Sequence, residues 1–248
     1  MFLNGYVGLE VAKTIKKSKD EVLIVFHCCD IQFEQNLRKV FNDPDLSILN
    51  WEKSKLEDIE ENFIRGPADF TITVYWPYLL RGNELNYAKD SVNFHPALLP
   101  INRGWYPHVH SIIDGSPLGV TLHRIDIGAD TGDIWVQKKV KMYDTEVASD
   151  IHMRLQNEMI QLFNEKWDKI RRHKLVPFAQ DPSKAVYHKK LDVDKYDIIE
   201  LDAPSTPRTI LNQLRARTFG EKGYAYFYNN DGRKIFVSIK FSVENTTV

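Results

Sequence analysis

The chain has 248 residues, 43% of them hydrophobic and 12% aromatic, so it can bury a sizeable core and is not a disordered chain. Its 33 basic and 34 acidic residues leave a formal net charge of −1, which offers no overall attraction for nucleic acid. The sequence contains no run of 18 apolar residues, and no basic segment followed by an apolar one opens it. We therefore expect a cytoplasmic protein without membrane association.

The first part of the chain alternates short apolar strands with helical patterns. This alternation predicts an α/β fold with a doubly wound, mostly parallel sheet. Strands are expected at Met1–Leu3, Val22–His27, Leu46–Asn50 and Phe70–Val74, and helices at Leu9–Ile15, Phe33–Phe41 and Leu56–Phe63.

Two glycines, Gly5 and Gly8, stand in the first strand-to-helix turn. They match only part of the dinucleotide-binding fingerprint, because Leu3 occupies its first glycine position, so a tight turn is favoured over NAD binding. Backbone N–H groups at the start of the following helix could still face a substrate phosphate. Gly5 is therefore a candidate substrate-binding residue.

The two cysteines of the chain, Cys28 and Cys29, are adjacent at the end of an apolar run. Neighbouring cysteines cannot bridge each other without strain. We interpret them as buried thiols in a reducing compartment rather than as a disulfide or a catalytic thiol.

The stretch from Ser91 to Asp133 carries the polar residues that matter most. A strand is expected at Val92–Phe94, and residues two apart on a strand share a face, so Asn93 and His95 project together. A second strand, Gly119–Arg124, leads into an acidic turn that contains Asp130. Each of these residues alone has an ordinary structural explanation. Brought together, an amide, an imidazole and a carboxylate suit acyl transfer to an amine, because the first two stabilise an oxyanion and the third orients the imidazole or accepts a proton.

Four histidines close in sequence raise the question of a metal site: His95, His108, His110 and His123. Cysteine ligands are absent from this region and no H-x-x-x-H spacing occurs there, so we expect no metal. His123 alternates with apolar residues on its strand, which favours a hydrogen-bonded structural histidine. A helix is expected at Pro107–Asp114, with His108 in its first turn facing a sugar or phosphate.

A long amphipathic helix is expected to begin at Asp144 or Thr145 and to end in a basic cluster. A solvated face and the negative end of the helix explain that cluster better than nucleic-acid binding. Prolines at 177–182 close the main domain, which gives two expected domains, 1–180 and 181–248.

The C-terminal domain has its own pattern. Tyr187–Ile199 alternates loosely, a short helix is expected at Pro207–Arg215, and two strands, Tyr224–Tyr228 and Ile235–Phe241, form a hairpin across the Asn-Asn-Asp-Gly turn. Val237, Ile239 and Phe241 share one face of this hairpin and have little of their own domain to cover them, so this face is expected to pack on the main domain or on a second subunit of a homodimer.

Three motifs resemble one known family. They are N-F-H-P-A-L-L-P from residue 93, Arg103-Gly104, and G-V-T-L-H-x-I-D-x-G-x-D-T-G-D-I from residue 119. They are similar to the formyltransferases that use 10-formyltetrahydrofolate. The resemblance implies a Rossmann-like formyltransferase domain with a small C-terminal β-hairpin extension. It also implies catalytic roles for Asn93, His95 and Asp130, and a folate pocket lined by Tyr78 and Leu80 on one side and by Asp126 and Gly128 on the other.

Within the family, Arg103–Ser111 and Arg215–Phe219 resemble the nucleotide-sugar branch. This implies formyl transfer to the amine of a nucleotide-linked aminodeoxy sugar, expected to be a dTDP-amino-dideoxyhexose for a surface polysaccharide such as the O-antigen. Arg103 and His108 are then substrate-binding residues, Tyr224 could stack on the base, and Arg215 or Arg217 could meet the diphosphate. Ordinary hairpin packing explains Tyr224 and Arg215 equally well.

Other functions stay open at this point. The acceptor could be methionyl-tRNA or glycinamide ribonucleotide, and the base could be guanine or uracil in place of thymine. The chain could also be a non-catalytic nucleotide-binding dimer, although all three residues of the expected site are present. The sequence does not specify the sugar or the position of its amine.

Overall fold

The computed structural model describes residues 1–53, 67–80 and 82–244, so the helix expected at Leu56–Phe63 lies outside the described residues. The chain forms two compact units. Unit 1 comprises Met1–His95, Thr121–Lys138 and Asn157–Gln180, and unit 2 comprises Pro96–Val120, Lys139–Gln156 and Asp181–Val248. The last change of unit falls between residues 180 and 181, where the sequence analysis divides the chain. Two functional domains with that boundary remain a prediction.

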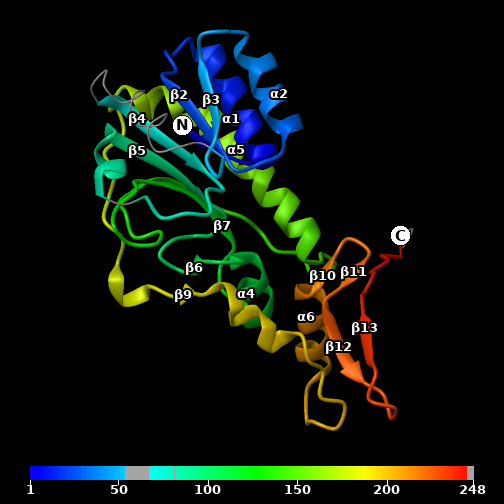
Figure 1. The fold of residues 1–248 in the computed structure, drawn as a ribbon. Coiled ribbons are helices and arrows are strands. Elements are labelled where there is room, and N and C mark those ends of the chain that lie inside the picture. Colours follow the sequence, from blue (N-terminus) through cyan, green and yellow to red (C-terminus); the bar gives the residue numbers. More distant parts are fainter. Residues whose placement is uncertain (54–66, 81, 245–248) are drawn as a thin grey trace. The chain divides into compact units, whose positions relative to one another are not determined.

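A seven-stranded sheet in the order β3-β2-β1-β4-β5-β7-β8 organises unit 1 (Figure 1). Its strands are β1 Phe2–Leu3, β2 Ile24–His27, β3 Ser47–Asn50, β4 Ala68–Val74, β5 Ala88–His95, β7 Gly119–His123 and β8 Ile134–Lys139. The pairs from β3 across to β5 are parallel, and β5 pairs with β7 antiparallel. The predicted mostly parallel α/β sheet is confirmed, and β5 extends well beyond the predicted Val92–Phe94.

Amphipathic helices pack on this sheet because their apolar residues recur at helical spacing. Among the described residues, the longest are α1 Gly5–Ser18, α2 Ile31–Phe41 and α5 Ala148–Arg171. The side chain of Asp30 caps α2 by accepting a hydrogen bond from the backbone N–H of Phe33, at 3.0 Å. In α5, Phe163 is fully buried and its ring lies 5.0 Å from that of Phe94 in β5. This contact ties α5 to the strand that carries Asn93 and His95.

The start of α5 differs from the prediction. The helix begins at Ala148, later than the Asp144 or Thr145 expected from the sequence. Glu146 accepts hydrogen bonds from the backbone N–H of Tyr143 and from Arg154, and Asp150 accepts one from the backbone N–H of Val147. These side-chain bonds to the backbone stabilise a turn before the helix, in competition with helical hydrogen bonds.

Unit 2 contains short elements around two helices. Helix α4, Pro107–Asp114, has the predicted bounds, and α6, Pro207–Ala216, extends the predicted helix by one residue. The predicted hairpin is also present as β12, Ala225–Tyr228, and β13, Lys234–Val237. The loosely alternating segment after Tyr187 is mostly not a strand, because only Tyr187–His188 (β9) is extended and Lys190–Tyr196 (η3) is a 3-10 helix. The remaining short elements are β6 Arg103–Gly104, β10 Thr218–Phe219, β11 Lys222–Gly223, η1 Gly82–Asn86 (in unit 1) and η2 Pro182–Lys184.

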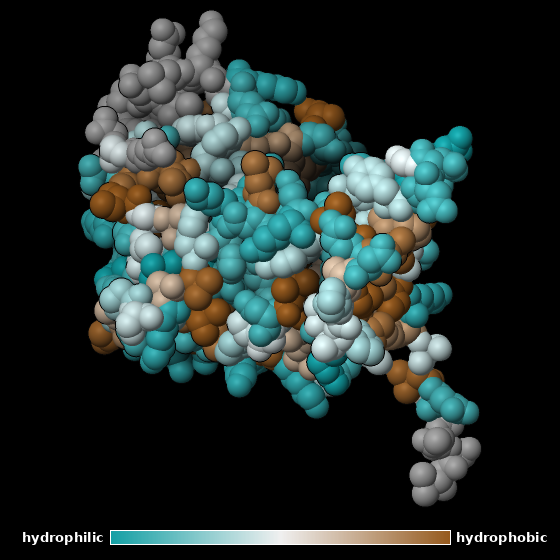
Figure 2. All heavy atoms as spheres, turned by 90° about the horizontal axis from the view of Figure 1, so that it is seen from below, coloured by the Kyte–Doolittle hydropathy of each residue, from teal (hydrophilic) through white to brown (hydrophobic). Residues whose placement is uncertain are grey.

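On the face seen in Figure 2, polar residues predominate and apolar side chains form separate patches. On the hairpin, Phe236 is 61% exposed and Tyr228 is 48% exposed. Among the described residues, no helix combines the length and the apolar composition that crossing a bilayer requires.

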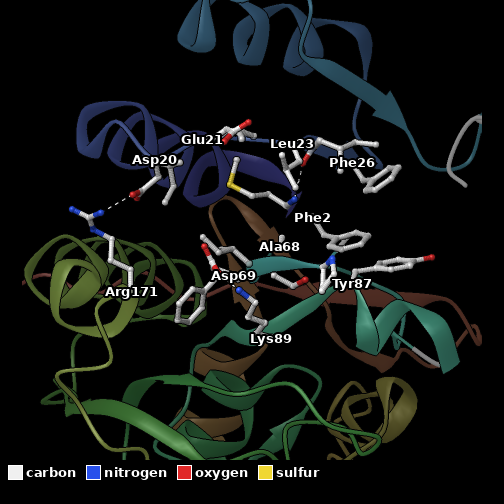
Figure 3. Close-up of a pocket in the computed structure, with 18 of the residues that line it drawn as sticks. Phe2, Asp20, Glu21, Leu23, Phe26, Ala68, Asp69, Tyr87, Lys89 and Arg171 are labelled. Atoms are coloured by element: carbon white, nitrogen blue, oxygen red, sulfur yellow. Dashed lines mark hydrogen bonds and ion pairs between the residues drawn. The ribbon is translucent and has the colours of Figure 1, made fainter. Parts of the chain in front are cut away.

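A cavity of about 480 Å³ lies at the amino-terminal ends of the strands of unit 1 (Figure 3). It exists because β4 pairs with β5 from Ala68 onward but with β1 only through Thr73 and Val74. Ion pairs between Asp20 and Arg171, and between Asp69 and Lys89, lie among its lining residues. In parallel sheets, ligands bind at the carboxyl ends of the strands, so this cavity is at the opposite end from Asn93 and His95.

Candidate active site

Four polar side chains of unit 1, which we call the Asn93 cluster, meet where β5 ends: Asn93, His95, His123 and Asp130. The Asn93 amide nitrogen lies 2.9 Å from His123 Nε2 and 3.3 Å from Asp130 Oδ1. Asp130 also lies 3.4 Å from both His95 Nδ1 and His123 Nε2. Both histidines are buried. The structure thus brings together the three residues predicted as catalytic.

Sheet register places the residues of this cluster side by side. Asn93 in β5 pairs with Thr73 in β4 and with His123 in β7. Side chains directly opposite on neighbouring strands are close enough to bond. His95, two residues after Asn93, follows on the same face at the carboxyl end of the strand.

The turn that carries Asp130 is tightly built. Asp130 has a left-handed backbone with φ of 56°, which aspartate tolerates better than most residues. Gln180 donates hydrogen bonds to the carbonyls of Asp130, at 2.9 Å, and Gly132, at 2.7 Å. A Cβ on Gly132 would lie 2.1 Å from the carbonyl oxygen of Arg124, so only glycine fits there. The carboxylate is therefore held towards the histidines by the backbone around it.

His123 is a member of the site that the sequence reasoning interpreted only as a structural histidine. Its Nδ1 lies 2.6 Å from the backbone carbonyl of Arg124. A carbonyl can only accept, so Nδ1 carries the proton and Nε2 accepts a hydrogen bond from the Asn93 amide. The hydrogen-bonded part of the prediction is confirmed. The pairing of β5 with β7, which a single strand pattern does not reveal, puts this histidine in the cluster.

The cluster is suited to acyl-transfer chemistry. Buried hydrogen-bond donors that converge on one point stabilise the negative charge that develops on a carbonyl oxygen. Asp130 lies 3.4 Å from Nδ1 of His95, so the carboxylate can orient this imidazole at the end of β5. An amide donor, an imidazole and a carboxylate can together bind an oxyanion and move one proton.

Of the two residues predicted to line one side of the folate pocket, Leu80 is buried and Tyr78 is exposed. The Leu80 side chain is 5% exposed and belongs to an apolar cluster with Phe2, Ile24 and Phe26. Tyr78 is exposed, and its hydroxyl donates to Glu52 at 2.7 Å, a contact that raises the pKa of the phenol. Any folate contact of Leu80 would have to come from its backbone. The folate roles of both residues remain predictions.

The other expected wall of that pocket is the turn itself. The Asp126 carboxylate accepts from the backbone N–H of Gly128, at 3.1 Å, and from the hydroxyl of Thr131. A Cβ on Gly128 would lie 2.2 Å from Thr131 Oγ1. Both residues shape the turn that presents Asp130, and their folate contacts remain predictions.

Gly5, a candidate for substrate binding, lies in unit 1 at the first residue of α1. It has a left-handed φ of 62°, and a Cβ added there would meet nothing within 4 Å. The side chain of the preceding Asn4 donates to the carbonyl of Tyr75 and accepts from the backbone N–H of Cys28. The turn is thus a braced structural turn with open space at Gly5.

The other substrate candidates, Arg103, His108, Arg215 and Tyr224, lie in unit 2. Arg215 is buried, and its guanidinium donates to the carbonyls of Glu146, at 2.9 Å, and Tyr143, at 2.7 Å. These hydrogen bonds to backbone carbonyls give Arg215 a structural role.

Each of the remaining three candidates has its own environment. His108 is buried, and burial lowers its pKa to about 3. Tyr224 is partly exposed beneath the side chains of Arg217 and Lys222, at 4.9 and 4.5 Å from its ring centre. Arg103 lies in β6, paired with β9. Substrate binding by these residues remains a prediction.

Both cysteine thiols have raised pKa values. Burial and the nearby Glu52 carboxylate raise the pKa of Cys28 to about 11, and burial raises that of Cys29. Both thiols are therefore protonated and poorly nucleophilic at neutral pH. Within residues 1–53, 67–80 and 82–244, histidine, cysteine and acidic side chains form no group of three or more that could hold a metal ion.

Comparison with known proteins identifies the family of the chain. Residues 12–166 match the family model "Formyl transferase", and residues 192–243 match "N-formyltransferase dimerization C-terminal domain". The dTDP-4-amino-4,6-dideoxyglucose formyltransferase of Mycobacterium tuberculosis is 34% identical over 154 residues, which are 62% of this chain and 65% of that protein. A methionyl-tRNA formyltransferase from Sulfurihydrogenibium is 27% identical over 71% of this chain and 56% of its own length.

The fold has close neighbours among solved structures. A 4-N formyltransferase from Francisella tularensis has a TM-score of 0.80 and 26% identity, over 98% of this chain and 97% of that one. The chain spans about two thirds of the curated sugar relative and roughly half of the methionyl-tRNA relative. The "Formyl transferase" model covers more than half of the 248 residues. The chain therefore belongs to the formyl transferase family.

Proposed function

We propose that this protein transfers a formyl group from 10-formyltetrahydrofolate to the amine of a nucleotide-linked aminodeoxy sugar. The observation that carries the proposal is the Asn93 cluster: an amide, two imidazoles and a carboxylate within hydrogen-bonding range at the end of β5, in a chain of the formyl transferase family. The acceptor class is supported by the relative from Mycobacterium tuberculosis, whose name gives a dTDP-linked amino sugar.

The position of the amine is proposed to be carbon 4 of a 4,6-dideoxyhexose. Two relatives with different bases support this. The Mycobacterium tuberculosis enzyme is named for dTDP-4-amino-4,6-dideoxyglucose. The formyltransferase PseJ of Anoxybacillus kamchatkensis, 28% identical over 78% of this chain with a TM-score of 0.57, was solved with a UDP-4,6-dideoxy-4-formamido sugar and tetrahydrofolate. The name of the Mycobacterium tuberculosis enzyme supports thymine as the base, and the ligand of the Anoxybacillus enzyme supports uracil.

The mechanism follows from the geometry. The neutral amine attacks the formyl carbon, and the Asn93 N–H together with the Nε2–H of His95 donates to the oxyanion. Asp130 stabilises the imidazolium of His95 and receives the proton of the attacking amine, directly or through water. Collapse of the intermediate breaks the bond from the formyl carbon to N10 of the folate, and N10 takes up the proton that Asp130 received from the amine, which regenerates the carboxylate. The amine is already a competent nucleophile, so no covalent enzyme intermediate is required.

The test is an acceptor panel. Purified protein is incubated with 10-formyltetrahydrofolate and, in separate reactions, dTDP- and UDP-linked 4-amino-4,6-dideoxyhexoses, methionyl-tRNA and glycinamide ribonucleotide. Mass spectrometry of the acceptor is expected to show a formamide on the nucleotide sugar. Formylation of methionyl-tRNA alone would overturn the acceptor assignment. No formylation of any acceptor, with nucleotide binding intact, would favour the non-catalytic alternative.

The proposed assembly is a homodimer in the cytoplasm. The match of residues 192–243 to a dimerization domain and the exposed apolar side chains of the hairpin support the dimer. Two free, protonated thiols agree with a reducing compartment. The relative named for dTDP-4-amino-4,6-dideoxyglucose favours a sugar acceptor over methionyl-tRNA, although methionyl-tRNA formyltransferases are among the relatives.

A further inference from the structure

The Asn93 side chain is held from both sides. Its amide oxygen accepts a hydrogen bond of 2.6 Å from the hydroxyl of Thr73, which is buried in β4. Its amide nitrogen donates to His123 Nε2, at 2.9 Å, and more weakly to Asp130, at 3.3 Å. The Thr73 hydroxyl therefore reaches the cluster through the Asn93 amide.

These contacts fix both the plane and the direction of the amide. His123 Nε2 is an acceptor, because Nδ1 donates to the Arg124 carbonyl, so it requires the nitrogen of Asn93 on its side. The Thr73 hydroxyl then meets the oxygen on the other side and limits rotation about the last side-chain bond, a torsion that is otherwise broad. Donation to the amide oxygen also polarises the amide, which makes its N–H a stronger donor.

The weaker of the two N–H contacts is the one that can be exchanged. At 3.3 Å, the bond to Asp130 is longer than that to His123, and it points towards the carboxylate beside His95. A formyl oxygen entering there would take this N–H while the bonds to Thr73 and His123 keep the amide in place.

We propose that Thr73 is a positioning residue of the formyl-transfer reaction: its hydroxyl holds the Asn93 amide so that one N–H is aimed at the developing oxyanion. The inference rests on the proposed function. It differs from the catalytic assignment because Thr73 acts only through Asn93. When the Asn93 amide is free to rotate, the enzyme binds substrate as before but stabilises the transition state less well. Loss of the Thr73 hydroxyl is therefore expected to lower kcat and to leave KM nearly unchanged.

The test compares two substitutions that differ by one hydroxyl. Thr73→Val removes the donor with little change in volume, and Thr73→Ser keeps it. Thr73→Val is expected to lower kcat between about twofold and tenfold, the range of one net hydrogen bond, with KM for both substrates within about twofold. Thr73→Ser is expected to restore most of kcat. Thr71→Val, a buried threonine two residues earlier on the same strand, is the matched control and should leave kcat unchanged.

A double-mutant cycle separates positioning from general damage to the fold. In an Asn93→Ala background, Thr73→Val should have no further effect on kcat, because the group that it positions is gone. Equal losses in both backgrounds would overturn the proposal, and so would full activity of Thr73→Val alone.

A crystal structure of each Thr73 variant tests the positioning role of Thr73 separately from the proposed function. If wild-type protein formylates no acceptor, the proposed function fails, but the inference can still be judged on structure. The Asn93 amide should be rotated or disordered in Thr73→Val and unchanged in Thr73→Ser. An amide in the wild-type orientation in crystals of Thr73→Val would refute the positioning role whatever the activity.

Discussion

At the scale of single residues, the two ring nitrogens of His95 differ in the roles proposed for them. Nδ1 faces Asp130, and Nε2 is the proposed donor to the oxyanion. Glutamine places an N–H near the position of Nε2, whereas asparagine places one near Nδ1. Because glutamine imitates Nε2 and asparagine imitates Nδ1, the two replacements of His95 are expected to differ in activity.

This leads to a graded prediction for His95. His95→Ala and His95→Asn should lose on the order of 10²–10³ in kcat, as expected for loss of an oxyanion donor, and His95→Gln should retain more. Asn93→Ala should lose a similar factor. Steady-state kinetics with the nucleotide sugar give the ranking, and circular dichroism confirms folding. Near wild-type turnover of His95→Ala would remove this residue from the mechanism.

At the scale of elements, an ion pair joins the loop that carries Asp130 to β5. Arg124, directly after β7, makes two hydrogen bonds to Asp90, at 2.9 and 2.6 Å, and lies over the ring of Trp135. The backbone N–H of Arg124 also donates to the carbonyl of Asp133 and closes the loop. Asp90 raises the pKa of the guanidinium, which stays charged at all physiological pH values. The pair therefore anchors the loop at its first residue.

Loss of this anchor should reduce both stability and catalysis. Arg124 is 37% exposed but the Asp90 side chain is only 7% exposed, so removing the guanidinium leaves a nearly buried carboxylate without its partner and destabilises the fold more than loss of an exposed pair would. Arg124→Met keeps the apolar stem but frees the loop, and kcat should fall severalfold because Asp130 is less precisely placed. Lys89→Met, which breaks the exposed pair with Asp69 at the start of β5, is the control. Equal kcat values for the two variants would show that the anchor has no part in catalysis.

At the scale of the whole molecule, buried neutral histidines make stability depend on pH. Burial lowers the pKa of His108 to about 3 and that of His110 to about 4, and it also lowers those of His152 and His188. The ring of His110 is stacked on that of His188 with 3.4 Å between centroids. Protonation of this pair would place two like charges in contact.

The direction of the pH effect follows from proton linkage. The unfolded chain binds protons on His108 and His110 below a pKa of about 6.5, whereas in the folded chain these two histidines resist protonation down to about 3 and about 4. Stability is therefore intact above pH 6.5 and is lost as the pH falls, by up to about 2 kcal/mol per histidine at pH 5.

Thermal unfolding between pH 7.5 and 5 measures this loss. The Tm of wild-type protein should fall by several degrees over that range, and His110→Phe should reduce the fall. A Tm that does not change with pH over this range would contradict the lowered pKa values.

The hairpin provides a prediction on assembly. Phe236 is 61% exposed on β13, and an exposed apolar side chain in a dimerization element is expected to be covered in the dimer. Light scattering at micromolar concentration should give a dimer for wild-type protein and a monomer for Phe236→Asp. Glu221→Gln, a substitution outside both strands of the hairpin, should remain dimeric. A monomeric wild type would end the dimer hypothesis.

Much of this protein could be read from its sequence, because periodicity, turn residues and motifs are local properties. They predicted the parallel sheet, the bounds of α4 and the hairpin turn, and they placed Asn93, His95 and Asp130 in one site. The catalytic roles of these three residues remain a prediction. The alternation of strands and helices needed no knowledge of contacts.

The tertiary structure determined which residues become neighbours. Thr73, Asn93 and His123 come from three strands separated in sequence, and they became neighbours only through the order β4-β5-β7. Strand order depends on long-range packing, which no local pattern encodes. For the same reason, the sequence could not show that Leu80 is in the core, that Arg215 is bound to backbone carbonyls, or that Thr73 and His123 hold the amide of Asn93.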